Sequence, residues 1–327
     1  MKLTSLIITI LLAASLCYAA PSAPVRSEED EDQAGAQQLE RTVASTSNVI
    51  VTVCIASGDV IVHGWDRAEV QARTMDAEQL ELQRSAPTET APATRVEVVV
   101  SNAPAVEGEE LTCDCSAASD ITLDVPRGAT VQIKTNDGSV EIADVADVRV
   151  ETLSGDISVR GVSKRVEASS VSGDVLLENS SGPVRLRSIS GSVEASHART
   201  IDANDDCQAN TVSGDVTLAE ISHTHVQAKT ISGAVTMKGP LARGGLYDFK
   251  TTSGDMIFTL PGDASFRISA RIPHGEIITD FTLKDVARNP PSIPAPRLLT
   301  GTYGTGDATL DLYSFSGTVR LHRDTVK

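Results

Sequence analysis

Aromatic side chains are scarce in this chain of 327 residues: they make up 3% of the residues, and Trp65 is the single tryptophan. Compact enzymes and glycan-binding domains with aromatic platforms usually carry more of them. A narrow solenoid needs few, because stacked Val, Ile, Leu, Thr and Ala side chains fill its core. The scarcity of aromatic residues therefore favours a solenoid.

Positive charge is also in short supply. The chain has 28 Lys and Arg residues against 44 Asp and Glu residues, which gives a formal net charge of −16. Nucleic acids and anionic lipid surfaces both require dense positive charge in a protein that binds them. The charge balance therefore argues against either as the main partner, and a solvated acidic surface explains it.

Long apolar runs are missing after the N-terminus. The chain starts with Met1 and Lys2, continues with an apolar run over residues 3–16, and then has small residues at Ala19 and Ala20. This order is typical of a secretory signal peptide, and the run is too short to span a bilayer, which takes about 20 residues. We predict cleavage after Ala19, no transmembrane span, and a mature protein in the periplasm, at the cell surface or outside the cell.

Cysteine is rare as well. Cys17 lies within the predicted signal peptide, and Leu16 before it stands where a lipobox requires Gly, Ala or Ser. Four cysteines remain in the mature chain: Cys54, Cys113, Cys115 and Cys207. In an oxidising compartment they allow two disulfides in three alternative pairings, or buried thiols. A redox or metal pair at Cys113 and Cys115 is the other interpretation, but no second pair of Cys or His at metal-ligand spacing accompanies it.

The chain divides into four predicted regions. Residues 1–19 form the signal peptide, and residues 20–47, with the acidic run at 28–32, form a disordered linker. Residues 48–125 contain irregular strand-like segments that cap the fold and lead into the repeats. Residues 126–327 form the repeats themselves, and no long segment has helical periodicity.

A Ser-Gly-Asp turn returns along the C-terminal two thirds of the chain. Consecutive repeat glycines from Gly138 to Gly275 are 17, 18, 18, 23, 19, 21 and 21 residues apart, and Gly317 follows 42 residues later. A fixed period near 20 residues is the signature of a solenoid. The predicted structural turn residues are Gly58, Gly138, Gly155, Gly173, Gly191, Gly214, Gly233, Gly254, Gly275 and Gly317.

Each repeat contains two short alternating strands joined by turns, which is enough chain to close one flattened coil. The position two residues after the glycine is apolar in every copy. It is occupied by Val60, Val140, Ile157, Val175, Val193, Val216, Val235, Met256, Ile277 and Val319. Stacking these coils gives a continuous core that no single coil could bury alone. The predicted fold is therefore all-β, a single-stranded parallel β-solenoid with coils of about 20 residues.

The turn residues have local structural reasons. Glycine permits the positive φ of a sharp corner, and Ser and Asp side chains hydrogen-bond the amides of turns. A Thr or Ser two places before the motif serine, such as Thr152 or Ser170, is in position for a ladder of hydroxyl groups. The repeat is thus explained by folding and implies no chemistry.

With these motifs the chain resembles the bacterial DUF4097 family of candidate adhesins, whose β-solenoid is called a toast rack. The resemblance rests on the serial Ser-Gly-Asp units, on residues 64–67 (Gly-Trp-Asp-Arg), on residues 124–128 and on residues 304–307. It covers residues 48–327. It implies an envelope or surface location and an adhesive or scaffolding role, and it supplies no catalytic residues to transfer.

Two groups of residues could in principle bind a metal ion. Gly-Asp turns in stacked coils can hold calcium, and Asp156 and Asp174 are the local candidates. Ser192 and Ala234 interrupt the Asp column, so a regular array is not encoded. His223 and His225 would lie on the same side of a strand, a geometry open to zinc, but no third ligand is identifiable. We therefore predict no metal site and no cofactor.

Catalysis is the last alternative. Parallel β-helices include polysaccharide lyases and hydrolases, which need charged residues clustered on one sheet face over adjacent coils. No P-loop, Gly-x-Ser-x-Gly or His-Glu-x-x-His motif appears, and we predict no catalytic residue. The sequence thus predicts a non-enzymatic, exported envelope protein that binds an envelope protein or a glycan. A polysaccharide-acting enzyme is the alternative, and self-association through the solenoid ends is a further prediction.

Overall fold

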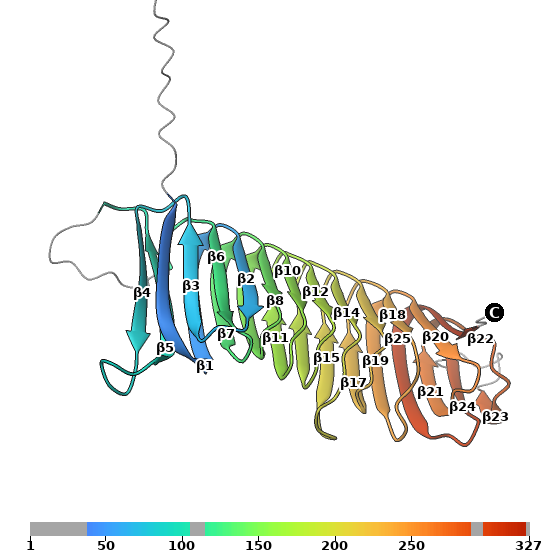
Figure 1. Ribbon diagram of the computed structural model, residues 1–327. Helices are drawn as coiled ribbons and strands as arrows, with labels where there is room; N and C mark the ends of the chain where they lie inside the picture. The colour runs from blue at the N-terminus through green and yellow to red at the C-terminus, as the bar shows by residue number, and fades with distance from the viewer. Residues whose placement is uncertain (1–37, 105–114, 289–296, 325–327) are drawn as a thin grey trace, which may run out of the picture. The chain divides into compact units, whose positions relative to one another are not determined.

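The computed structural model describes residues 38–104, 115–288 and 297–324, which belong to one compact unit. The described residues form strands and turns and contain no helix, so none of them provides a helix able to cross a membrane. Most strands pair in parallel with strands of neighbouring coils, as Figure 1 shows. The predicted all-β parallel solenoid is confirmed.

Two ladders of parallel strands make up the long sides of the solenoid. In ladder one the strands stack in the order β5 (Ala93–Ser101), β1 (Leu39–Ser57), β7 (Thr130–Asp137), β9 (Asp147–Ser154), β11 (Arg165–Ser169), β13 (Val184–Arg187), β15 (Asp206–Asn210), β17 (His225–Lys229), β19 (Leu246–Ser253), β25 (Ala308–Asp324) and β21 (Phe266–Ile272).

Ladder two follows the same coils on the other side. Its order is β6 (Ile121–Pro126), β2 (Val60–Trp65), β8 (Val140–Ala143), β10 (Ile157–Arg160), β12 (Val175–Glu178), β14 (Val193–Ser196), β16 (Val216–Ala219), β18 (Val235–Lys238), β20 (Met256–Pro261), the second half of β25, and β22 (His274–Thr279).

Antiparallel strands finish both ends of the described stack. Strand β3 (Glu69–Thr74) pairs with β6 and with the start of β1, and β4 (Gln79–Ser85) pairs with β5. At the other end β24 (Arg297–Tyr303) pairs with β21, and β23 (Lys284–Arg288) pairs with β24. Antiparallel strands therefore cover both ends of ladder one and the N-terminal end of ladder two, whereas the other end of ladder two is the parallel strand β22. Self-association through the ends stays a prediction.

The stack does not follow the order of the chain at its ends. The coil of β1 and β2 lies between β5/β6 and β7/β8. Likewise β25 lies between β19 and β21 in one ladder and between β20 and β22 in the other, as the red strand among orange ones in Figure 1 shows. The Gly317 coil therefore lies before the Gly275 coil in the stack, although it follows it in the chain, because each terminal coil is inserted one place in from the end.

The predicted boundary of the N-terminal linker also needs correction. Strand β1 begins at Leu39, inside the predicted linker at residues 20–47. Its first residues are ordered because they pair with β3 in antiparallel register, from Leu39 opposite Thr74 to Ala44 opposite Glu69. Strands β1 and β2 also belong to the stack of coils and not to a separate lead-in region.

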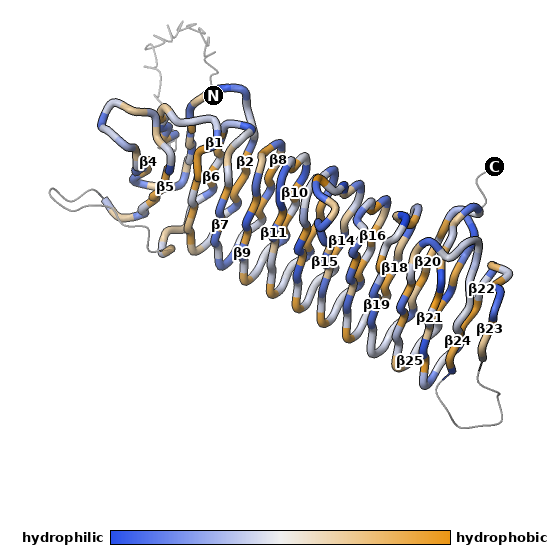
Figure 2. Tube along the Cα trace, turned by 90° about the horizontal axis from the view of Figure 1, so that it is seen from below, coloured by the Kyte–Doolittle hydropathy of each residue, from blue (hydrophilic) through white to orange (hydrophobic). Residues whose placement is uncertain are grey.

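The predicted apolar column forms the core. Parallel pairing places Val140, Ile157 and Val175 on consecutive strands of ladder two, and all are buried. The remaining members of the column are buried too, except Ile277, which is half-buried on the last strand of that ladder. Hydrophobic and hydrophilic positions alternate along the strands, as the orange and blue of Figure 2 show. One face of each strand thus lines the core.

The repeat glycines stack directly on one another. A Cβ atom added to any of nine of them would lie far inside van der Waals contact with the carbonyl oxygen of the glycine one coil away. A Cβ atom on Gly173, for example, would meet the carbonyl oxygen of Gly155, and one on Gly191 would meet that of Gly173. Only half of the ten glycines have a clearly positive φ: Gly58, Gly138, Gly155, Gly254 and Gly317. The close approach of backbones, more than the φ angle, therefore requires glycine here.

Buried hydroxyl groups support the same contact. From Ser170 onward, the hydroxyl group two places before the motif serine donates to a glycine carbonyl of the neighbouring coil. Thr211, for example, donates to the carbonyl of Gly191 at 2.8 Å. The hydroxyl groups do not bond to one another, so the predicted hydroxyl ladder is wrong in its partners. They satisfy the carbonyls that the glycine stack buries.

The glycine contact predicts a sharp difference between two substitutions. Gly173→Ala should cost more than about 3 kcal/mol of unfolding free energy, because its Cβ would collide with the Gly155 carbonyl. Gly244→Ala, at φ +74 with nothing within 4 Å of its Cβ, should cost about 1 kcal/mol through φ alone. Urea unfolding of both variants measures the difference. Equal losses would contradict the steric account.

Candidate functional site

The outward side chains of ladder one form a long polar surface, which we call the ladder-one face. They stand in columns, because parallel register places equivalent residues on neighbouring strands side by side. One column reads Gln132, Arg149, Glu167, Arg185, Gln208, Gln227, Asp248, Asp311 and Ser269. The next reads Lys134, Glu151, Ser169, Arg187, Asn210, Lys229, Lys250, Tyr313 and Arg271.

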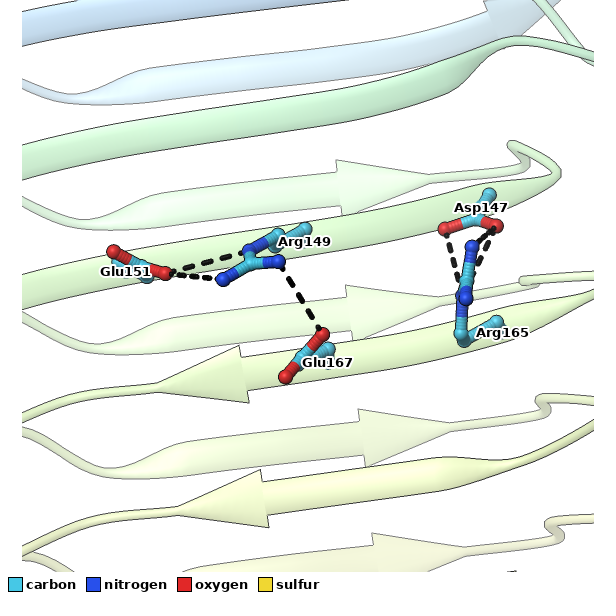
Figure 3. A network of polar contacts seen from close by, with 5 residues as sticks. All are labelled: Asp147, Arg149, Glu151, Arg165 and Glu167. Atoms are coloured by element: carbon cyan, nitrogen blue, oxygen red, sulfur yellow. Dashed lines mark hydrogen bonds and ion pairs between the residues drawn. The ribbon is translucent and has the colours of Figure 1, made fainter.

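At β9 and β11 the charged groups of this face neutralise one another (Figure 3). Arg165 Nη2 lies 2.7 Å from Asp147 Oδ2, and this hydrogen bond raises the pKa of Arg165. Arg149 lies 2.9 Å from Glu151 and 3.9 Å from Glu167, and these carboxylates raise its pKa as well. Because these groups pair with one another, this end of the face is a structural network.

Farther along the stack the ladder-one face is hollowed. One hollow of about 480 Å³ lies over β19, β25 and β21, and a second of about 530 Å³ lies over β13 to β19. The two share Leu246 and Asp248 in their linings. Together they form a shallow depression across several coils, which we call the polar hollow.

Donors and acceptors of opposite charge line the polar hollow. Asp248 Oδ2 accepts a hydrogen bond from Lys250 Nζ at 2.8 Å and one from Gln227 Nε2 at 3.3 Å. Asp311 lies next to Asp248 in register, is exposed, and has no side-chain hydrogen bond or ion pair with another described residue. Its carboxylate is thus available to a ligand.

An aromatic ring and a second cation complete this surface. Tyr313 lies between Lys250 and Arg271 in register, and 37% of its surface is exposed. An exposed ring flanked by two cations and two carboxylates can stack on a sugar and hydrogen-bond its hydroxyl groups. The polar hollow therefore has the chemistry to hold a hydroxyl-rich ligand.

The sequence predictions missed the polar hollow. Asp311 and Tyr313 are about 60 residues from Asp248 and Lys250 in the chain, and the insertion of β25 beside β19 brings them together. No local motif signals that insertion.

The two residues considered for calcium, Asp156 and Asp174, bind backbone amides of the neighbouring coil. Asp156 Oδ1 accepts the amide of Asp174 at 2.9 Å, and Asp174 Oδ1 accepts the amide of Ser192 at 2.7 Å. The same bond recurs from Asp59, Asp120, Asp215 and Asp255 to the next coil. These carboxylates therefore join coil to coil. Within the described ranges no group of three or more His, Cys, Asp or Glu residues is arranged to hold a metal ion.

The cysteines take two roles in the described chain. A disulfide joins Cys54 and Cys115, with their Cα atoms 4.7 Å apart. Cys207 is a free thiol in the core, between Val184 and Val226 in ladder one, and burial raises its pKa to about 12. Cys207 is therefore unsuited to act as a nucleophile. Cys113 lies outside the described residues.

The two histidines weighed for zinc lie in different surroundings. His223 is fully buried before β17 and its Nε2 lies 2.9 Å from the carbonyl oxygen of Gly182, whereas His225 is exposed on β17. The carbonyl can only accept, so Nε2 carries the proton. Burial lowers the pKa of His223, while the Gly182 carbonyl and the nearby Asp205 act in the opposite direction. The two imidazoles therefore do not share one side of a strand, which is the geometry that a zinc pair would need.

The buried histidine predicts a pH dependence of stability. Burial holds the pKa of His223 in the folded state below its ordinary value of 6.5, so well above that pH the imidazole is neutral in both states and does not change the stability. As the pH falls below 6.5 the unfolded chain binds a proton first, and the folded state loses stability. His223→Gln keeps a donor for Gly182 and cannot titrate. Urea unfolding at about pH 7 and 5 should show a smaller loss in the variant; an equal loss would contradict the assignment.

The comparisons with known proteins agree with this fold. The toastrack DUF4097 family matches residues 51–234 and 183–322. No curated protein matches the chain.

Two solved structures are similar. One is a candidate cell adhesion protein from Clostridium sporogenes (9% identity, TM-score 0.23, covering 88% of this chain and 100% of that one). The other is a candidate adhesin from Parabacteroides merdae (9% identity, TM-score 0.36, covering 90% of this chain and 98% of that one). At these scores neither similarity carries an argument about this chain. The family match spans most of the described coils, and the chain belongs to the toastrack DUF4097 family.

Proposed function

We propose that the protein is an exported, non-enzymatic binding module of the cell envelope, with an adhesive or scaffolding role. Its binding surface is the polar hollow, and its ligand is a glycan. The observation that carries this proposal is the pair of large hollows that meet at Leu246 and Asp248 on the ladder-one face.

The shape and chemistry of the hollow support an extended ligand. Its lining comes from neighbouring strands of ladder one, which lie about 4.8 Å apart. In the order of the stack these strands are β13, β15, β17, β19, β25 and β21. A chain of sugars laid across these strands would meet a carboxylate, amide or cation at each step. Gln208, Gln227 and Asp311 offer acceptors or donors in one column, and Tyr313 and Arg271 lie in the next.

Export is supported by two independent features. Residues 1–19 have the order of a charged start, an apolar run and small residues that is typical of a signal peptide. Cys54 and Cys115 form a disulfide, and disulfides form and persist mainly in proteins of oxidising compartments. Both features fit a protein that folds outside the cytoplasm.

A polysaccharide-acting enzyme is the second candidate. The adjacent Asp248 and Asp311, with Lys250 and Arg271 beside them, form the kind of charged cluster over neighbouring coils that such an enzyme needs. A carboxylic acid that donates a proton is usually held in an apolar enclosure. Here Asp311 is exposed and Asp248 is bonded to Lys250, so the geometry supports binding better than catalysis.

Glycan binding tests the proposal directly. Envelope polysaccharides and their oligosaccharides are immobilised and probed with the wild type, with Tyr313→Ala/Arg271→Ala, and with Arg149→Ala as a control from the opposite end of the same face. The double variant should bind about tenfold more weakly or worse, because it loses the ring and one cation of the hollow. Arg149→Ala should bind like the wild type.

Two results would contradict the proposal. If the wild type bound no envelope glycan detectably, the proposal that its ligand is a glycan would be contradicted. Release of reducing ends from a polysaccharide, abolished by Asp311→Asn, would favour the enzyme.

A further inference from the structure

A row of large apolar side chains lies exposed along the edge where ladder one turns into ladder two. In five consecutive coils it occupies the position two residues before the repeat glycine, between the buried hydroxyl residue and the motif serine. We call this row the apolar stripe. Its members, with their exposed fractions, are Leu153 (56%), Val171 (37%), Ile189 (48%), Val212 (40%) and Ile231 (51%).

The backbone holds the stripe in a straight register. The carbonyl of each member accepts an amide from the next coil: Ser172 bonds to Leu153, Ser190 to Val171, Ser213 to Ile189, Ser232 to Val212 and Ser253 to Ile231, at 2.8–2.9 Å. Consecutive coils lie about 4.8 Å apart, so the five side chains form a continuous rigid row. The row is thus preorganised for contact with another surface.

The exposed apolar side chains of the protein are concentrated in this row. Five of the twelve large hydrophobic side chains that are exposed among the described residues belong to the stripe, and Phe315 lies two coils farther along the same edge. Single exposed apolar residues are common on soluble proteins, but a contiguous set marks an interaction surface. None of the five belongs to the buried hydrophobic core.

Opposite charges flank the stripe on its two sides. On the side of the ladder-one face, the position two residues before each stripe member is occupied by Glu151, Ser169, Arg187, Asn210 and Lys229, so the cations beside the stripe are Arg187 and Lys229. Arg187 and Lys229 form no ion pair with another described residue. On the other side, past the turn, are the exposed carboxylates of Asp156, Asp174 and Asp215. From Val171 to Ile231 the stripe therefore separates a basic margin from an acidic margin, whereas at Leu153 both margins are acidic.

We propose that the apolar stripe is the interface with a second copy of this chain, with the two solenoids side by side and parallel. A two-fold axis along the stripe places the basic margin of one copy opposite the acidic margin of the other. An axis across the stripe would place like charges opposite one another. Charge complementarity thus selects the parallel arrangement, in which each stripe residue meets its own copy.

The stripe is only one side chain wide, and this small area limits the affinity of the proposed dimer. Stable interfaces usually bury about 800 Å² per partner, and a row of five aliphatic side chains covers less than that. The flanking charges must supply part of the contact. The dimer is therefore reversible, and it weakens as salt screens the two margins.

Sedimentation of residues 20–327, which contain the whole compact unit, tests the dimer. The wild type should pass from monomer to dimer below about 100 µM, and Ile189→Asp should raise the dissociation constant about tenfold or more. Ile278→Asp is the matched control: Ile278 is 39% exposed on β22, off the stripe and at the C-terminal end of the stack. Both substitutions are at exposed positions, and circular dichroism confirms that the variants fold.

Cysteine crosslinking tests the orientation in a Cys113→Ser background, where Cys54 and Cys115 are paired and Cys207 is buried. Leu153→Cys should form a disulfide with its own copy in the parallel pair. In an antiparallel pair Leu153→Cys would instead crosslink to Ile231→Cys in a mixture of the two variants.

Each other outcome overturns the proposal. A wild type that stays monomeric at about 100 µM has no such interface. Loss of the dimer in Ile278→Asp but not in Ile189→Asp places the contact at the solenoid end. A monomer that uses the stripe to bind lipid vesicles or another protein has a different partner. None of these results bears on glycan binding, which involves a different surface.

Discussion

The contact on which the structure depends is the stacking of one repeat glycine on the carbonyl of the next. No other residue fits there, because a Cβ atom would overlap the neighbouring backbone. The contact fixes the distance between coils at the turn, and the strands on both sides then pair in one register from β7 to β20. Aspartate carboxylates and buried hydroxyl groups bond across the same junction and satisfy the polar groups that the stack buries.

This register decides what the surface can do. Once equivalent residues stand side by side, each outward position of the repeat becomes a column, and its chemistry depends on how that column varies. On the ladder-one face the columns change from an ion-pair network at Arg149 to the open hollow at Asp311. At the turn the column stays aliphatic for five coils and gives the apolar stripe. A binding surface and an interface between copies can thus coexist on one scaffold.

The repeat itself could be predicted from the sequence, because the pattern is local. The glycines, the apolar column through Val140 and Ile157, and the parallel solenoid all follow from a period near 20 residues. The insertion of the terminal coils could not be predicted, since a coil with Gly317 fits the stack equally well before or after one with Gly275. The polar hollow depends on that insertion, so it was missed too. The partners of Asp174 and of the hydroxyl groups likewise require knowledge of which backbone atoms face them.

Hydrogen exchange of β25 tests the account most directly. Its amides and carbonyls pair with β19 and β21 in one ladder and with β20 and β22 in the other, and Gly317 stacks on Gly254. The account predicts that residues 308–321 exchange as slowly as the central strands β13 to β18, although they lie near the end of the chain. Fast exchange of these residues, ahead of β21 and β22, would show a fraying terminal strand and would contradict the inserted order of the coils.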